Sequence, residues 1–206
     1  MIRARIAAPL AVLACLLAAA GPARAEKKIF GLTSQGAGDT LLCASESSMA
    51  LGAYLLYETG RPLEETLPIA RQSATGKAQP ADAERRLRAV NAAKPRTTAQ
   101  WGRQVFQSCL AQKLVPLPVA RTGNCYMLTF YLAAVVPVHK ANGHTPKTMM
   151  DIIVTKEADP TFRTKLEPLV VEYYGRSDAD PRKNNVSDLG RFLKCANPGQ
   201  PAVSGA

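Results

Sequence analysis

The residues in this sequence that most clearly predict chemistry are four of its five cysteines, which fall into two pairs at a repeated spacing. The fifth, Cys15, lies in the N-terminal 25 residues, which we expect to be removed as a leader. Cys43 and Cys109 form the first pair, and Cys125 and Cys195 form the second. An even number of cysteines at a repeated spacing is typical of disulfides made in an oxidising compartment. Three pairings are possible, and the repeat favours Cys43–Cys109 with Cys125–Cys195. Each bridge closes a loop of roughly 70 residues, for which chain entropy predicts about 4 kcal/mol of stabilisation.

Other residue patterns that support chemistry are missing from the sequence. No Gly-x-Ser-x-Gly motif offers a hydrolase nucleophile, and no Cys-x-x-Cys motif offers a redox or zinc site. Gly31, Gly36 and Gly38 are not followed by Gly-Lys-Ser/Thr, so a phosphate-binding loop is not predicted. His139 and His144 are the only histidines, and an Asn-Gly pair between them keeps them off one helical face. We therefore predict no catalytic, cofactor-binding or metal-binding residues and expect a protein that is not an enzyme.

A charged segment at residues 175–185 has no full counterpart in the first half of the chain. The stretch from Val170 to Cys195 is six residues longer than the stretch from Val90 to Cys109. An insertion in one copy of a repeat is a common place for added function. A tolerated surface loop explains the extra length equally well. On the first interpretation, the segment binds a partner protein through charged residues: Arg176, Asp178, Asp180, Arg182 and Lys183.

Landmarks in the same order indicate that each cysteine pair belongs to one copy of a helical module. In both copies the first cysteine precedes an apolar stretch that ends at a glycine, and a proline and a valine follow before the closing cysteine. These landmarks are Gly60, Pro80 and Val90 in one copy and Gly143, Pro160 and Val170 in the other. The sequence therefore predicts an all-α fold of two tandem small helical bundles, each tied by one disulfide. The modules are residues 26–115 and 119–197, and residues 198–206 are expected to form a flexible tail.

Apolar residues at 3- and 4-residue steps predict four helices in each module. The first helix of the first module is expected to start near Asp39, a plausible N-cap, and to end at Gly60. Its counterpart in the second module contains Pro137, which should kink it. The closing cysteines fall on the fourth helices, so each bridge should tie helix one to helix four. Two prolines in residues 115–118 separate the modules.

The N-terminal 25 residues have the features of a secretory signal peptide. Arg3 and Arg5 precede an apolar run, and Ala23-Arg24-Ala25 is a cleavage site of the A-x-A type. We expect cleavage after Ala25 and a periplasmic or secreted mature chain. An alternative is a lipoprotein in which Cys15 is lipidated. After the leader, no stretch approaches the roughly 20 apolar residues that cross a bilayer.

The chain is basic, with 26 Lys and Arg against 16 Asp and Glu and a formal net charge of +10. The excess is spread over both modules, which is typical of an ordinary basic exported protein. An acidic partner or an anionic surface is the alternative interpretation. Nucleic acid is disfavoured because the chain leaves the cytoplasm and shows no interleaving of aromatic and basic residues.

The landmarks Cys43…Gly60…Cys109 and Cys125…Gly143…Cys195 resemble those of the periplasmic immunity proteins of type VI secretion, of the Tai and Rap type. The resemblance covers nearly all of the mature chain. It implies a non-enzymatic protein that binds and blocks a peptidoglycan-degrading toxin, so the implied partner is a secreted cell-wall hydrolase. The chain departs from the family in holding two modules, which puts a one-to-one stoichiometry in doubt. No binding residue can be carried over from the family.

Two functions from other classes stay open beside the immunity interpretation. One is a periplasmic chaperone or an envelope-associated binding module that uses the basic surface and the grooves between helices. The other is an enzyme of a type that the sequence does not reveal, for which a deep pocket with converging polar groups would be the sign.

Overall fold

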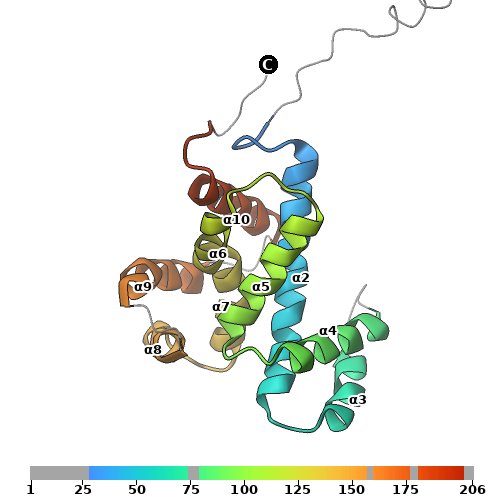
Figure 1. The fold of residues 1–206 in the computed structure, drawn as a ribbon. Helices are drawn as coiled ribbons and strands as arrows, with labels where there is room; N and C mark the ends of the chain where they lie inside the picture. Colours follow the sequence, from blue (N-terminus) through green and yellow to red (C-terminus); the bar gives the residue numbers. More distant parts are fainter. Residues whose placement is uncertain (1–27, 74–78, 157–159, 177–180, 202–206) are drawn as a thin grey trace, which may run out of the picture.

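The computed structural model describes residues 28–73, 79–156, 160–176 and 181–201 (Figure 1). Within these ranges the regular structure is helical, apart from one isolated bridge between Ile29 and Leu32. The predicted all-α class is therefore confirmed. None of the helices in the described part of the chain has the length and apolar character needed to cross a membrane. The expected leader and residues 202–206 of the expected tail lie outside the described residues.

The helices form two groups that follow each other along the chain. The first group holds α2 (Ser34–Glu58), α3 (Leu63–Ser73), α4 (Pro80–Ala93) and α5 (Thr98–Gln112). The second holds α6 (Val119–Tyr126), η1 (Met127–Tyr131), α7 (Leu132–Ala141), α8 (Pro146–Lys156), α9 (Pro160–Gly175) and α10 (Pro181–Ala196). Helices α6, η1 and α7 run on without a break and together correspond to α2.

Equivalent helices pack against each other in the two groups. In the first group, α2 packs against α4 and α5, and α3 packs against α4. In the second group, α7 packs against α9, the α6–η1 segment packs against α10, and α8 packs against α9. The chain turns after the first long helix at Gly60 and at Gly143, both in the left-handed region, with φ of 69° and 74°. The order and pairing of helices thus correspond, while superposition of the two modules stays a prediction.

Helix α2 begins earlier than the sequence suggested. We expected a start near Asp39, but the helix begins at Ser34, and Thr33 is its N-cap. The Thr33 hydroxyl accepts a hydrogen bond from the Gly36 amide at 3.1 Å, which satisfies one of the free N–H groups of the first turn. Gly36 and Ala37 are buried, so packing of this first turn offsets the low helix propensity of glycine.

The first long helix of the second group contains a π-helical turn, η1. Gly143 lies 18 residues after Cys125, whereas Gly60 lies 17 residues after Cys43. A π-helical turn accommodates one extra residue within an α-helix, so η1 absorbs the difference between the two copies. Helix α7 continues through Pro137, where the sequence predicted a kink, and the change in helical geometry precedes it.

Both predicted disulfides are present. Cys43 of α2 is bonded to Cys109 of α5, and Cys125 of α6 is bonded to Cys195 of α10. The Cα–Cα distances are 5.5 and 5.7 Å. Each bridge therefore ties the first helix of its group to the last, as predicted.

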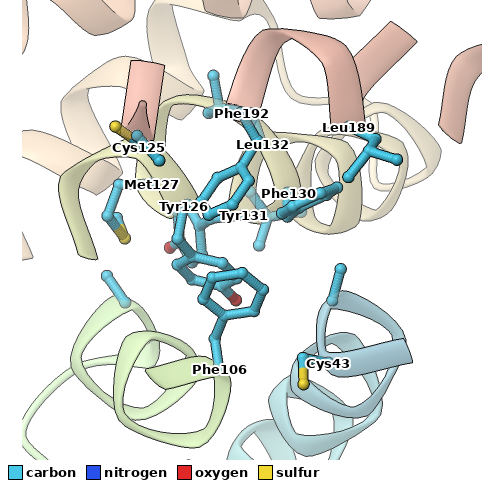
Figure 2. Packing of buried hydrophobic residues seen from close by; sticks show 14 of the residues in the cluster. Cys43, Phe106, Cys125, Tyr126, Met127, Phe130, Tyr131, Leu132, Leu189 and Phe192 are labelled. Carbon is cyan, nitrogen blue, oxygen red and sulfur yellow. The ribbon is translucent and has the colours of Figure 1, made fainter. Parts of the chain in front are cut away.

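The largest hydrophobic core crosses the boundary between the groups. Phe106 of α5 stacks on Tyr126 of α6, with ring centroids 4.8 Å apart, and meets the edge of Phe192 of α10 at 5.2 Å. Figure 2 shows Phe106 reaching from the first group toward the aromatic side chains of the second. A smaller cluster that includes Leu87 and Trp101 lies inside the first group. The modules are thus joined by shared packing as well as by the linker.

Candidate functional site

The charged segment predicted to bind a partner is only in part a loop. Helix α9 ends at Gly175 and α10 begins at Pro181. Most of the six additional residues therefore lengthen these two helices instead of forming a surface loop. Asp178 and Asp180 lie outside the described residues, and of Arg182 only the backbone is described. Lys183 is exposed in the first turn of α10.

Arg176, the first residue of this predicted set, is held in a network with α9 and α10. Its guanidinium is 2.6 Å from the Asp188 carboxylate and 3.2 Å from the Glu172 carboxylate. It also lies over the ring of Tyr173, 3.6 Å from the centroid, a favourable cation–π geometry. The Arg176 side chain is 16% exposed. Arg176 therefore has a structural role, since it links α9 to α10. Its part in partner binding stays a prediction.

Asp188 is the buried centre of this network. It is 2% exposed, and the Tyr173 hydroxyl donates a hydrogen bond to it at 2.7 Å. Burial, followed by the Asp188 carboxylate, raises the pKa of Tyr173 far above its usual range. Glu172 also bonds Arg191, and that hydrogen bond, more than the one from Arg176, holds the pKa of Glu172 below its usual value. Two arginines and two carboxylates thus lock the end of α9 to α10.

An apolar pocket of about 300 Å³ lies between the two helix groups. Its buried walls are apolar or aromatic and come from α2, α5, η1, α7 and α8: Leu51, Ala99, Tyr131, Val135 and Ile153. Its more exposed lining residues are Ser48, Gly52, Leu55, Glu58, Thr97, Thr98, Ala134, Val138, His139 and Ile152. Leu55 and Val138 are each 46% exposed. The pocket thus has buried walls that are mainly apolar and a solvent-exposed margin that contains both apolar and polar residues.

Small residues and a helix cap shape the pocket. Gly52 leaves open space beside α2, since a Cβ built there meets no atom within 4 Å. Ala99 and Ala134 add only methyl groups to the walls. Thr97 caps the start of α5 by accepting a hydrogen bond from the Gln100 amide at 3.0 Å, which fixes the helix end that borders the pocket. The pocket therefore results from small side chains and a fixed helix end.

The two histidines meet beside the pocket. The turn at Gly143 lets the His144 amide donate to the His139 carbonyl at 3.0 Å. The two Nδ1 atoms are 2.8 Å apart. Helical periodicity does not predict this contact, because the chain reversal after α7 brings the two rings together. Across the described residues no group of three or more His, Cys, Asp or Glu side chains is placed to hold a metal ion.

Ser48, His139 and Glu58 all line the pocket, and these residue types form the triads of some hydrolases. The Ser48 hydroxyl, however, donates to the carbonyl of Ala44 at 3.0 Å, one turn back in α2. Ser48 and Glu58 are ten residues apart on α2, which is about 15 Å along a helix axis. The triad geometry is not assembled, and the arrangement offers binding of an apolar group as its chemistry.

Comparisons with protein-family models, with curated proteins and with solved structures found no match to this chain.

The pocket was not predicted from the sequence. Its lining residues come from five helical segments that are separated by up to about a hundred positions along the chain, so no local pattern marks them. Leu55 and Val138 are exposed apolar residues, but Leu42 and Val186 are exposed too and lie outside the pocket, so apolar residues on helix surfaces do not mark it. Only the fold shows that Leu55 and Val138 border one pocket.

Proposed function

We propose that this chain is an exported binding protein that acts without catalysis. The observation that carries the proposal is the apolar pocket between the helix groups. Its walls are held by two disulfides and by a core shared between the groups. A site that is rigid before its ligand arrives loses little conformational entropy on binding, and this preorganisation favours affinity.

The disulfides fit a chain that folds in an oxidising compartment outside the cytoplasm. Together with the leader-like residues 1–25, they support a periplasmic or secreted location after cleavage following Ala25. Mass spectrometry of the protein from a periplasmic fraction tests this. The expected N-terminus is Glu26, and a diacylglycerol-modified Cys15 would support the lipoprotein alternative instead.

For the protein partner, we propose a secreted cell-wall hydrolase, as the resemblance to type VI immunity proteins implies. The contact surface is the junction of α9 and α10. The ion-pair network around Asp188 supports this choice, because it fixes both helices beside the charged residues that the sequence analysis selected. Lys183 is exposed there and is the first residue to test.

The experiment uses the oxidised mature chain and the wall hydrolase encoded nearest to its gene. We expect a stable complex and loss of peptidoglycan hydrolysis. Lys183→Glu should weaken the complex at least tenfold, whereas Lys194→Glu, an exposed change in the last turn of the same helix, should leave it unchanged. Full hydrolysis in the presence of excess chain would reject a hydrolase as the partner.

An envelope-associated binding module is the second candidate function. The specific observation that favours it is again the pocket, since buried walls that are mainly apolar suit the apolar part of a small envelope molecule. The two candidates use different surfaces, so one chain can serve both.

A further inference from the structure

We propose that the pocket between the helix groups binds one hydrocarbon chain of a free amphiphile whose head group carries no negative charge. The inference rests on the proposed binding role of this pocket and names its ligand class. Three properties of the pocket carry it: its volume, the chemistry of its walls and the charges at its mouth.

The volume limits the ligand to a single chain. The pocket holds about 300 Å³, at the lower end of the range for small-molecule sites. A water-sized group takes about 30 Å³, so the pocket accommodates roughly ten methylene-sized groups. A second chain of the same length exceeds this space, whereas one chain of about ten carbons fills it.

The walls select a ligand without polar atoms along its length. Leu51, Ala99, Val135 and Ile153 present aliphatic surface and are each less than 10% exposed. Tyr131 completes the buried lining. A polar group carried into this region would lose its water without gaining a matching set of partners, so the apolar end of the ligand enters first.

The mouth carries negative charge. Glu58 lines the pocket, is exposed and is the last residue of α2. Helix α7, which also borders the pocket, ends at Ala141 just beyond His139. The C-terminal ends of both helices add partial negative charge to that of the carboxylate, while the last turn of α7 also contains His139 and Lys140. The N-terminus of α5 reaches the pocket as well, and Thr97 satisfies one of its free amides, the Gln100 N–H. A carboxylate or phosphate head group is therefore disfavoured, and an amine or hydroxyl head group is favoured.

The first test is calorimetric titration of the oxidised mature chain with decylamine and with decanoate, both below their micelle concentrations. We expect saturable one-to-one binding of decylamine in the micromolar range, at least fivefold tighter than binding of decanoate. The binding enthalpy should become more negative with temperature, as burial of apolar surface requires. Absence of saturable binding, or tighter binding of decanoate, would overturn the proposal.

A pair of glycine variants places the ligand in the pocket. Gly52 and Gly38 both lie on the exposed side of α2, and a Cβ at either position meets no atom within 4 Å. Only Gly52 lines the pocket. Both Gly52→Leu and Gly38→Leu should fold, because leucine has a higher helix propensity than glycine. We expect Gly52→Leu to weaken decylamine binding at least tenfold and Gly38→Leu to leave it unchanged. Equal affinities of the two variants would overturn the assignment.

Two further experiments test the contribution of the head group and whether the hydrocarbon chain comes from a free amphiphile or from a membrane lipid. Glu58→Gln should weaken decylamine binding about two- to fivefold, the range expected for an exposed charge pair, and should narrow the preference over decanoate. Sedimentation with phosphatidylethanolamine vesicles should leave the chain in solution. Vesicle binding without decylamine binding would overturn the choice of a free amphiphile. A hydrolase complex that forms while decylamine fails to bind would defeat this inference and leave the proposed binding function standing.

Discussion

Tyr126 and Tyr173 are held in their neutral form by burial. Burial raises the pKa of both phenols far above the usual value of about 10, although the Ser47 hydroxyl, bonded to Tyr126, opposes the shift there. Above pH of about 10 the unfolded chain loses protons that the folded chain keeps, so the free energy of unfolding falls as pH rises. We expect Tyr126 and Tyr173 to keep their protons as long as the chain stays folded. Ultraviolet absorbance during an alkaline titration measures this.

Circular dichroism recorded during the same titration provides the control, because it shows when the chain unfolds. The two protected phenols should ionise together with the loss of helix. Tyr126→Phe should remove one of the two late ionisations. Ionisation of all six tyrosines with the helix signal intact would contradict the expected burial.

Arg176 and Arg191 both contact Glu172, but only Arg176 contacts the buried Asp188. Arg176→Ala leaves the Asp188 carboxylate buried without a cationic partner, which costs about 3 kcal/mol. Arg191→Ala removes a pair with the half-exposed Glu172 and should cost less than about 1 kcal/mol. Urea unfolding of the two variants checks the difference. Equal losses would contradict a special role for the Asp188 contact.

The cysteine pairing could be predicted from the sequence, and the Asp188 network could not. The four cysteines repeat at matching positions, so the spacing alone favoured one connectivity among three. Asp188 lies on α10, whereas Arg176 directly follows α9, twelve residues earlier in the chain. Nothing in the sequence states how α9 crosses α10. The sequence therefore predicts a surface charge at Arg176, whereas the structure pairs it with the buried carboxylate of Asp188.

At the scale of helices, the packing of α5 against its neighbours depends on Gly102. A Cβ at this position would lie 2.5 Å from the Tyr126 hydroxyl and 2.9 Å from a methyl of Leu51. Tyr126 is held by Ser47 and by its stacking on Phe106, so it cannot move away cheaply. Gly102→Ala should destabilise the chain by about 2 kcal/mol, because overpacking outweighs the gain in helix propensity.

Gly38→Ala is the matched control for Gly102→Ala. Gly38 lies in α2 with open space around it, so the change should stabilise the chain by up to about 1 kcal/mol through helix propensity alone. Thermal unfolding of both variants measures the opposite signs. Stabilisation by Gly102→Ala would mean that α5 sits further from α2 and α6 than the structure places it.

The existence of the helices could be predicted well, and their ends less well. Apolar steps indicated the long helices, and Gly60 and Gly143 marked where the chain turns. The start of α2 was missed because Gly36 and Gly38 argue against a helix, while the cap at Thr33 and the burial of the first turn favour one. The charged residues at 175–185 favour a surface segment between helices, yet Pro181 is a favourable first residue for a helix, and α10 begins there.

For the whole molecule, the shared core predicts a single cooperative unfolding transition. Phe106 and Phe192 belong to different groups and pack in one cluster, so each group loses part of its buried packing when the other unfolds. We expect Trp101 fluorescence, which reports the first group, and amide exchange in α9 and α10 to give the same midpoint in urea. Two separate midpoints would support two independent modules.

The isolated first group provides a second check of this coupling. A chain of residues 28–114 leaves Phe106 without the aromatic rings of the second group. We expect it to bind a hydrophobic dye and to unfold without a sharp transition, since a group of this size loses a large share of its buried surface. The same dye should not bind the intact oxidised chain in this way.

Each disulfide joins two cysteines that are neighbours in the order of the chain, with Cys43 bonded to Cys109 and Cys125 bonded to Cys195. A chain that crosses a membrane from its N-terminus presents these thiols one after another. An oxidase that links each newly emerged cysteine to the previous unpaired one thus makes both native bridges directly. On this route no bridge has to be broken and remade, so we expect oxidation of the chain to need an electron acceptor but no disulfide isomerase.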